Sequence, residues 1–441
     1  MASQVSEKKS TFTTLVTGAN SGLGFAICCR LIDEFLATRP QTQTLQLLFS
    51  TRDKRKGDAT LHRLNAYFQK ALREANGRTL GISRLLEARV KIEGVLVDLT
   101  ELLTVKRLAE QLLSREERLD VVIWNAGITG YAGLNWPKAV WHMCTDLIHA
   151  TTYPTYALPD IGLAAKWQLR GLRSTDQATA GSADEPKLGQ VFLANVFGHY
   201  MLTHWLAPLF TPSSRVIWIS SISATPPTFD IEDLQCLRSE TAYEGSKRLT
   251  DMLVLTSELP SAAPYVSTLL DTPREAVKPK MYVTHPGVIV TSIAGLHWFI
   301  SFFMVCTMHV VRLFGSPWHP VSPYKGAVSA AFVALAPPDQ LSDLEARDGK
   351  GKWGSAISVY NDERVARTEV GGWGFGGKIG KVPAGSVTGT KGRYRGLQDT
   401  NEVSRQQFEE DGRRLWREME ELRVEWEERL ESASLENIGK F

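Results

Sequence analysis

The chain has 441 residues, of which 43% are hydrophobic and 22% charged, a balance typical of a globular protein with room for one large core or two smaller ones. Its formal net charge of +2 gives no reason to expect nucleic acid as a partner. The five cysteines (Cys28, Cys29, Cys144, Cys236 and Cys306) are scattered without a C-x-x-C spacing, which predicts reduced thiols in a cytosol-facing protein, with no metal site and no disulfide framework.

The first third of the chain alternates strand-like and helix-like segments. Short apolar runs rich in β-branched residues predict strands over 12–18, 44–52, 90–100 and 119–127, and helical patterns lie between them at 21–38, 53–88 and 102–116. Such alternation predicts a parallel sheet with helices on both faces. The fold class is therefore α/β, a doubly wound, Rossmann-like sheet in a single domain.

The regular alternation stops at 129–190, a long insert with many aromatic residues and a Ser/Ala/Gly/Asp-rich tail. We expect its aromatic half to pack and its tail, at 173–187, to be flexible. Alternation resumes with helices at 191–210, 243–259 and 321–336 and strands at 214–224 and 280–291. We assign 1–340 to the main domain.

Residues 341–441 form a C-terminal extension, with glycine-rich loops at 371–396 and a charged amphipathic helix near the end. One stripe of that helix is apolar: Phe408, Leu415, Trp416, Met419, Leu422 and Trp426. The stripe predicts that the helix docks on the domain, and a partner-binding helix is the alternative.

Residues 293–315 are strongly apolar but contain His297, His309 and Arg312. A spanning helix needs about 20 mostly apolar residues. The composition of this segment favours a position in one leaflet of a membrane over a helix that spans the membrane. A buried core helix or a subunit contact is the alternative. The N-terminal stretch MASQVSEKKSTFTT has no apolar core, so we expect no secretory signal there.

A glycine-rich loop, TGANSGLG, lies between the first predicted strand and helix. Gly18, Gly22 and Gly24 let the backbone turn sharply and approach a phosphate closely, and the helix behind them offers free N–H groups. The loop predicts a pyrophosphate site, with an ordinary strand-to-helix turn as the alternative.

The second predicted strand ends in Thr51 and Arg52, followed by further basic residues. An acidic residue near this point binds the ribose 2′-hydroxyl of NAD, whereas an arginine accommodates the 2′-phosphate of NADP. The sequence therefore favours NADPH. Asp53 opposes this choice, but it follows Arg52.

Tyr243 and Lys247 stand one helical turn apart in TAYEGSKRLT. A nearby ammonium stabilises a phenolate and lowers the pKa of a phenol from about 10. The spacing alone also allows an ordinary packed tyrosine and a solvated lysine.

Six motifs in one order resemble the short-chain dehydrogenase/reductase family. They are TGANSGLG, NAG at 125–127, Asn195 in ANVFGHY, ISSIS at 219–223, YEGSK, and HPGV at 285–288. The resemblance spans about 15–290. It implies that Tyr243 donates a proton to a carbonyl, and that Lys247 supplies positive charge and binds the nicotinamide ribose. Ser221, the second serine of its run, would hold the substrate oxygen, although chemistry alone does not separate it from Ser220 and Ser223. Asn195 would hold a water that relays protons.

The same resemblance implies a cofactor site. Asp98 would meet the adenine, and Asn125 and Gly127 would line the floor of the adenine ribose site. The remaining residues that would bind the cofactor lie in the glycine loop and at the end of the sixth predicted strand: Asn20, Ser21, Leu23, Pro286, Gly287, Val288, Val290 and Ser292.

Extra residues between Ser221 and Tyr243, TPPTFDIEDLQCLRSE, resemble those of the 3-keto-steroid reductases of sterol C-4 demethylation and of their relatives among the 17β-hydroxysteroid dehydrogenases. The aromatic insert and the apolar segment resemble the fungal members. This implies NADPH-dependent reduction of the 3-keto group of a 4-methyl sterol to the 3β-alcohol in ergosterol biosynthesis. It also implies a place on the cytosolic face of the endoplasmic reticulum membrane or on lipid droplets, beside other C-4 demethylation enzymes.

Two alternatives remain open at the level of sequence. One is reduction of another lipophilic carbonyl, such as a 17-ketosteroid, a retinal-type aldehyde or a secondary metabolite. The other is a mainly structural role as a scaffold in a sterol-modifying complex.

Overall fold

The computed structural model of the protein describes residues 10–169, 185–271, 278–291, 298–387 and 391–438. Within them the strands are β1 (Ser10–Val16), β2 (Gln43–Thr51), β3 (Val90–Leu96), β4 (Val121–Trp124), β5 (Tyr131–Leu134), β6 (Ala157–Pro159), β7 (Arg215–Ile219), β8 (Lys280–His285), β9 (Lys352–Ile357) and β10 (Glu363–Thr368).

The helices up to the middle of the chain are α1 (Gly22–Thr38), α2 (Lys54–Arg78), α3 (Ile82–Glu87), α4 (Leu102–Leu113), α5 (Trp136–Thr145), α6 (Leu147–Thr152), α7 (Gln190–Phe192) and α8 (Gly198–Trp205). Those that follow are α9 (Ala242–Thr256), α10 (Ala263–Leu269), α11 (Trp298–Leu313), α12 (Pro323–Gly326), α13 (Val328–Leu335), α14 (Pro338–Asp348) and α15 (Glu402–Ile438). A π-helical turn, Leu193–Phe197, precedes α8, and short 3-10 turns occupy Ala207–Leu209, Pro226–Thr228 and Ile231–Asp233.

One 8-stranded sheet forms the centre, in the order β3-β2-β1-β4-β7-β8-β9-β10. Every neighbouring pair is parallel except β9 and β10. The order reverses between β1 and β4, the point where a doubly wound sheet opens a crevice at the carboxyl ends of its strands. The predicted fold class is confirmed.

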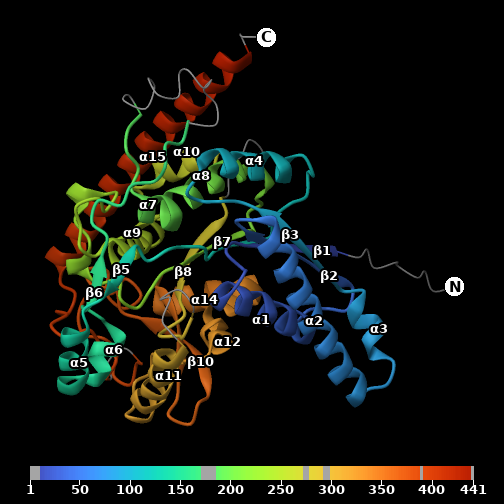
Figure 1. The fold of residues 1–441 in the computed structure, drawn as a ribbon, viewed down its shortest axis with the longest axis horizontal. Coiled ribbons are helices and arrows are strands. Elements are labelled where there is room, and N and C mark those ends of the chain that lie inside the picture. Colours follow the sequence, from blue (N-terminus) through green and yellow to red (C-terminus); the bar gives the residue numbers. More distant parts are fainter. Residues whose placement is uncertain (1–9, 170–184, 272–277, 292–297, 388–390, 439–441) are drawn as a thin grey trace.

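Helices cover both faces of the sheet (Figure 1). The first face carries α1, α2, α12 and α13, and the other carries α4, α8, α9 and α15. Neighbouring strand residues alternate between the two cores: Leu15 belongs to one and Val16 to the other. Strands buried on both faces need apolar side chains at every position, which explains the unbroken VVIW run of β4.

The predicted helix over 53–88 is two helices. α2 ends at Arg78 and α3 begins after Gly81, whose φ of +84° breaks the helical path. The 129–190 insert contains the β5–β6 hairpin, α5 and α6. Its aromatic residues divide: Tyr153 is buried, whereas Trp136 and Trp141 are exposed, so the expectation that this half packs is only partly correct. Of its tail, 173–184 lies outside the described residues.

The extension continues the main sheet. β9 pairs with β8 and β10 with β9, so the sheet crosses the predicted boundary at residue 340. α15 packs its apolar stripe against α9 and α10, which confirms the predicted docking: Trp416, Met419 and Trp426 are at most 1% exposed.

Candidate active site

A cavity of about 620 Å³ opens along the carboxyl ends of the central strands. Most residues predicted to bind cofactor or substrate lie on its wall: Gly18, Asn20, Ser21, Gly22, Leu23, Gly24, Thr51, Arg52, Asp98, Asn125, Gly127, Ser221, Tyr243, Lys247, Pro286, Gly287 and Val288. This volume falls in the range of small-molecule and cofactor sites.

The glycine loop is held in place by its neighbours. Gly18 has a φ of +68°, and Asn125 donates its side-chain amide to the carbonyls of Thr17 and Gly18 at 2.9 and 3.3 Å. A Cβ on Gly24 would lie 2.3 Å from the Gly18 carbonyl oxygen. These two glycines therefore serve the packing of the turn itself. The Ser21 side chain does not cap α1, which leaves N–H groups at the helix start available to an anion.

The far end of the cavity carries the predicted adenine-side residues. Thr51 is buried and donates its hydroxyl to the Asp53 carbonyl at 3.0 Å. The Asp98 carboxylate accepts bonds from the N–H and hydroxyl of Thr100 at 2.9 and 2.7 Å. The Arg52 side chain is exposed and has no hydrogen-bond partner among the described residues. Its guanidinium is therefore available to a ligand.

Tyr243 lies in the first turn of α9 and on the cavity wall. Burial and, to a smaller extent, the neighbouring Glu244 raise the pKa of its phenol to about 12, although a hydrogen bond with the Ser221 side chain acts in the opposite direction. The expected lowering of this pKa by Lys247 is thus not found. The Lys247 ammonium lies 5.8 Å from the centre of the Tyr243 ring and donates to the Ile219 carbonyl at 2.8 Å instead.

Lys247 is 4% exposed. Burial lowers the pKa of its ammonium to about 8; the Asp251 carboxylate acts to raise this pKa and Lys352 to lower it. The lysine keeps its charge near neutral pH, and among the described residues it has no ion-pair partner of its own.

The structure separates the three serines. Ser220 donates its hydroxyl to the Lys247 carbonyl at 3.2 Å, so it is committed to the backbone. The hydroxyls of Ser221 and Ser223 lie 2.8 Å apart, and Ser221 is the one that interacts with Tyr243.

Asn195 is not on the cavity wall. It lies in the π-helical turn before α8, a distortion often found at functional sites. Its side chain accepts the Ile128 N–H at 2.8 Å and donates to the Ser246 hydroxyl at 2.9 Å. These contacts occupy the side-chain amide, so the predicted water relay remains a prediction.

Val290 is also absent from the cavity wall, which its neighbours Ile289 and Thr291 line instead. Its backbone N–H donates to the Val321 carbonyl at 2.9 Å. Ser292 lies outside the described residues.

Tyr131 and Glu244 are among the wall residues that were not predicted. Tyr131 of β5 donates its hydroxyl to the Glu244 carboxyl at 2.5 Å, and its ring meets the Tyr243 ring edge-on at 6.1 Å. Burial raises the pKa of Glu244. The position of Glu244 directly after Tyr243 in the sequence could have indicated that its carboxyl lies near the Tyr243 phenol. Thr151, Thr152 and Pro154 at the end of α6 complete this part of the wall, and no local pattern marks them.

Within the described residues, no group of three or more histidine, cysteine, aspartate or glutamate side chains is arranged to hold a metal ion. Nor is any helix there both long and apolar enough to cross a membrane.

No family model matches the chain. Among solved structures that align with it are a variant of actinorhodin polyketide ketoreductase with NADPH (16% identical, covering 75% of this chain and 92% of that one, TM-score 0.40) and a metagenomic short-chain oxidoreductase in complex with NADP (17%, 75% and 93%, TM-score 0.36).

Curated relatives are much more similar. The chain is 41% identical over 442 residues to the 3-keto-steroid reductase of Aspergillus fumigatus, with 95% of each chain covered. It is 36% identical over 455 residues to that of Gibberella zeae, with 94% of each covered, and 28% identical over 348 residues to that of Saccharomyces cerevisiae, with 78% and 85% covered. The chain therefore belongs to the family of fungal 3-keto-steroid reductases.

Proposed function

We propose that this protein uses NADPH to reduce the 3-keto group of a 4-methyl sterol to the 3β-alcohol in ergosterol biosynthesis. The observation that carries the proposal is one cavity with Ser221, Tyr243 and Lys247 at one end and the glycine loop on its wall, in a chain 41% identical over 95% of its length to a protein named 3-keto-steroid reductase.

The residues present fit NADPH. The uncapped start of α1 suits the pyrophosphate, and the uncommitted Arg52 guanidinium suits a 2′-phosphate. Bound NADPH would supply the hydride. Asp98, Asn125 and Gly127 would hold the adenine side, and Pro286, Gly287 and Val288 the nicotinamide side.

The protein's own part is to hold the ketone and deliver the proton. With a pKa of about 12, Tyr243 stays protonated at neutral pH and is the acid that donates to the ketone oxygen. Ser221 donates a second hydrogen bond to that oxygen and polarises the carbonyl. Lys247 adds positive charge beside the phenolate that remains.

Tyr243→Phe tests this assignment. With NADPH and a 4-methyl-3-ketosterol, the variant is expected to lose at least about 100-fold in kcat, because general acid catalysis contributes 10²–10⁴-fold. Tyr360→Phe, at a residue 86% exposed, is the matched control and should keep the wild-type rate. A variant that still reduces the ketosterol at the normal rate would show that Tyr243 is not the proton donor.

The same preparation decides the substrate. A panel of 3-ketosterols, 17-ketosteroids and retinal, with product analysis, is expected to give a 3β-alcohol from the 4-methyl-3-ketosterol at the highest kcat/KM. A clear preference for a 17-ketosteroid or an aldehyde would contradict the proposed substrate.

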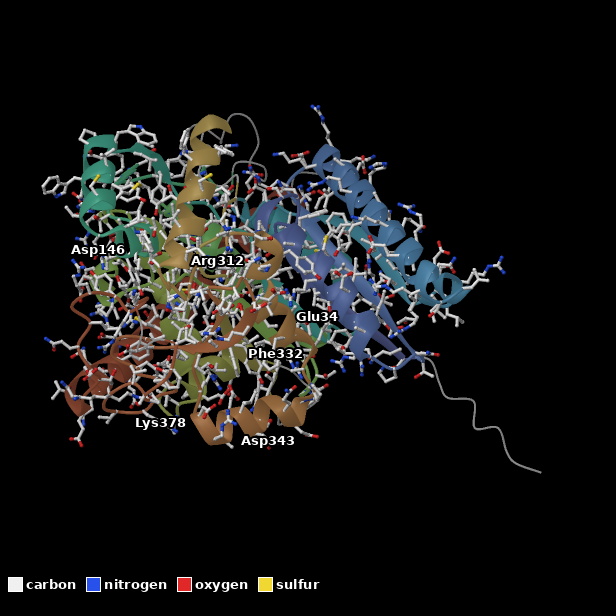
Figure 2. All side chains as sticks on the ribbon, turned by 90° about the horizontal axis from the view of Figure 1, so that it is seen from below. Glu34, Asp146, Arg312, Phe332, Asp343 and Lys378 are labelled. Carbon is white, nitrogen blue, oxygen red and sulfur yellow. The ribbon has the colours of Figure 1, made fainter. Side chains whose placement is uncertain are left out.

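We place the protein on a membrane surface, on the cytosolic face of the endoplasmic reticulum, beside the other enzymes of sterol C-4 demethylation. Two helices far apart in sequence support the membrane contact. α5 and α11 project on the same side of the molecule (Figure 2), and α6 contacts both. Large exposed apolar side chains gather on these two helices: Trp136, Val140, Trp141, Phe302, Phe303, Val310 and Leu313. Among the described residues of α5, Lys138 and Thr145 are exposed as well. Neither helix contains an acidic residue.

Helix α6 connects this apolar surface to the cavity, since it contacts both α5 and α11 and its last residues line the cavity wall. Thr151 and Thr152, at the end of α6, line the cavity wall, so a lipid-dissolved ketone has a short route from the surface to the site.

Flotation with liposomes tests the contact. The triple change Trp141→Ser, Phe302→Ser and Phe303→Ser should lower binding on the order of tenfold or more, because three large apolar side chains are removed. Leu80→Ser, at a residue 92% exposed beside α3, is the control and should bind as the wild type does. Equal binding by the triple variant would place the contact elsewhere.

A further inference from the structure

A buried ion pair lies just behind the proposed catalytic residues. The Lys352 ammonium of β9 donates to the Asp251 carboxylate of α9 at 2.7 Å, and the two side chains are 2% and 0% exposed. Asp251 lies one helical turn after Lys247, and neither member of the pair is on the cavity wall.

The same ammonium also donates to the backbone carbonyl of Ser221 at 2.6 Å. Two further bonds connect this stretch to α9: the Lys247 ammonium donates to the Ile219 carbonyl at 2.8 Å, and the Ser220 hydroxyl donates to the Lys247 carbonyl at 3.2 Å. At the end of β7, two ammonium groups therefore bind the backbone: that of Lys247 at the Ile219 carbonyl and that of Lys352 at the Ser221 carbonyl. Of these three bonds, only the one from Lys352 acts on Ser221 itself, whose carbonyl also accepts the Ala224 N–H at the longer distance of 3.3 Å.

We infer that Lys352 and Asp251 are positioning residues for the ketone-binding end of the site. Lys352 fixes the Ser221 backbone, so that the Ser221 hydroxyl faces Tyr243, and Asp251 holds the Lys352 ammonium in place and shares its field with Lys247. The inference rests on the proposed function, since it assigns the two residues to that same site.

The distances make this role specific. A carbonyl held at 2.6 Å by an ammonium that is itself paired has little freedom to move, and small displacements of a positioning group cost large factors in rate. Asp251 has one carboxylate oxygen without a hydrogen-bond partner, so its main contact is the ammonium. The orientation of Lys352 thus depends on Asp251.

The pair also sets the charge around Lys247. Asp251 acts to raise the pKa of Lys247 and Lys352 to lower it, and Asp251 has the larger effect of the two. The other titratable or charged groups near the pair or Lys247 are Tyr243 and Arg248 of α9, His199 of α8 and His285 of β8. Removing both charges should therefore lower the pKa of Lys247.

If the ion pair served only the stability of the fold, replacing both of its members would leave the rate of ketone reduction unchanged. Removing one partner of a buried ion pair leaves an uncompensated charge, whereas removing both charges is often tolerated. The informative variant is therefore Lys352→Met/Asp251→Asn. Its control is Arg423→Met/Glu420→Gln, which removes another buried ion pair, on α15 and off the cavity wall.

Four proteins are compared with NADPH and the 4-methyl-3-ketosterol: wild type, Tyr243→Phe and the two double variants. We expect Lys352→Met/Asp251→Asn to melt like the control variant, to bind NADPH like the wild type at about pH 6.5, where Lys247 keeps its charge, and to reduce the ketone about 10- to 100-fold more slowly. The basic limb of its pH profile should move to lower pH. The control variant should keep the wild-type rate and profile.

The inference would be overturned if the wild type is active, the Lys352→Met/Asp251→Asn variant is equally active, and the pH profile of that variant does not move. An inactive wild type would contradict the proposed substrate instead, and the comparison would be made with whichever ketone of the panel the wild type reduces. If the double variant does not fold, Lys352→Arg decides, because it keeps the charge and the pairing but cannot place one donor on the Ser221 carbonyl in the same way. A wild-type rate in Lys352→Arg would overturn the inference, and a slowed rate with unchanged NADPH binding would support it.

Discussion

Lys247 works from an interior position. Its ammonium is held by one backbone carbonyl, and burial has already lowered its pKa to about 8. The charge it contributes beside Tyr243 is therefore present at neutral pH and is lost as the pH rises through about 8. The site thus combines a phenol whose pKa is raised, that of Tyr243, with an ammonium whose pKa is lowered, that of Lys247.

The pH dependence of reduction should reflect Lys247. Its ammonium is charged below a pH of about 8 and neutral above it, so kcat/KM for the ketone should fall as pH rises through that value. The Tyr243 phenol, with a pKa of about 12, stays protonated throughout. A steady-state profile from pH 6 to 10 measures this. A rate that stays flat to pH 10 would contradict the role of the ammonium.

Glu244 should control the reverse reaction. Oxidation of the alcohol needs the phenolate of Tyr243, and the Glu244 carboxyl raises the pKa of that phenol. Glu244→Gln should lower the pKa, and each unit of lowering gives about ten times more phenolate at a fixed pH. The pH profile for alcohol oxidation should then move to lower pH.

Glu232→Gln, in the exposed turn before α9, is the control for that variant and should leave the oxidation profile unmoved. An unmoved profile in Glu244→Gln as well would show that its carboxyl does not act on Tyr243.

The positions of site residues were predictable where a side chain belongs to a short local motif. Gly18, Tyr243 and Lys247 lie in such motifs, and all three lie on the cavity wall. The partner of Lys247 was not predictable, because Ile219 is 28 residues away and offers only a backbone carbonyl. Lys352 was not predictable either, since it lies in an unremarkable strand that only the folded sheet brings behind Ser221.

At the scale of elements, α9 is enclosed on two sides. One side meets β8 and the cavity, and the other meets α15, whose Trp416 donates its indole N–H to the Leu253 carbonyl at 3.2 Å. α15 thus supports the helix that carries Tyr243 and Lys247, although its own side chains do not line the cavity.

Trp416→Ala should be strongly destabilising. The side chain is 1% exposed, and removing a buried tryptophan costs about 3–5 kcal/mol of the free energy of unfolding. Trp141→Ala, at a residue 68% exposed on α5, should change it by no more than about 0.5 kcal/mol. Urea denaturation of both variants checks this. A small effect at Trp416 would mean that α15 contributes little to the core.

Helices were predictable where the apolar residues repeat with a clear helical period over a long segment. The long runs at 21–38 and 102–116 form α1 and α4. β9 and β10 were missed because a short strand such as KWGSAI is recognisable only beside β8. The break between α2 and α3 depended on the backbone angle of one glycine.

For the whole molecule, cofactor binding and stability are linked. The glycine loop, β2 and α9 come from distant parts of the chain and meet at one cavity, so a dinucleotide there would hold them together. A ligand that binds only the folded state adds stability in proportion to its occupancy.

NADPH at one hundred times its Kd should therefore add about 2.7 kcal/mol to the free energy of unfolding. NADH at the same concentration should add less, because Arg52 is available to a 2′-phosphate. Arg52→Ser should reduce the shift with NADPH and leave the shift with NADH unchanged. Thermal melts with each cofactor measure this, and equal shifts for NADPH and NADH in the wild type would remove the role of Arg52.

The docking of α15 also has a consequence for how the protein is made in the cell. The ribosome releases α9 long before α15, and the stretch from Lys247 to Ala433 takes roughly 10 to 40 s to synthesise at about 5–20 residues per second. Throughout that interval the face of α9 that later meets Trp416 has no cover from its own chain. A nascent chain paused in this interval should present an apolar helix face to chaperones, and completion of α15 should be the step that ends their binding.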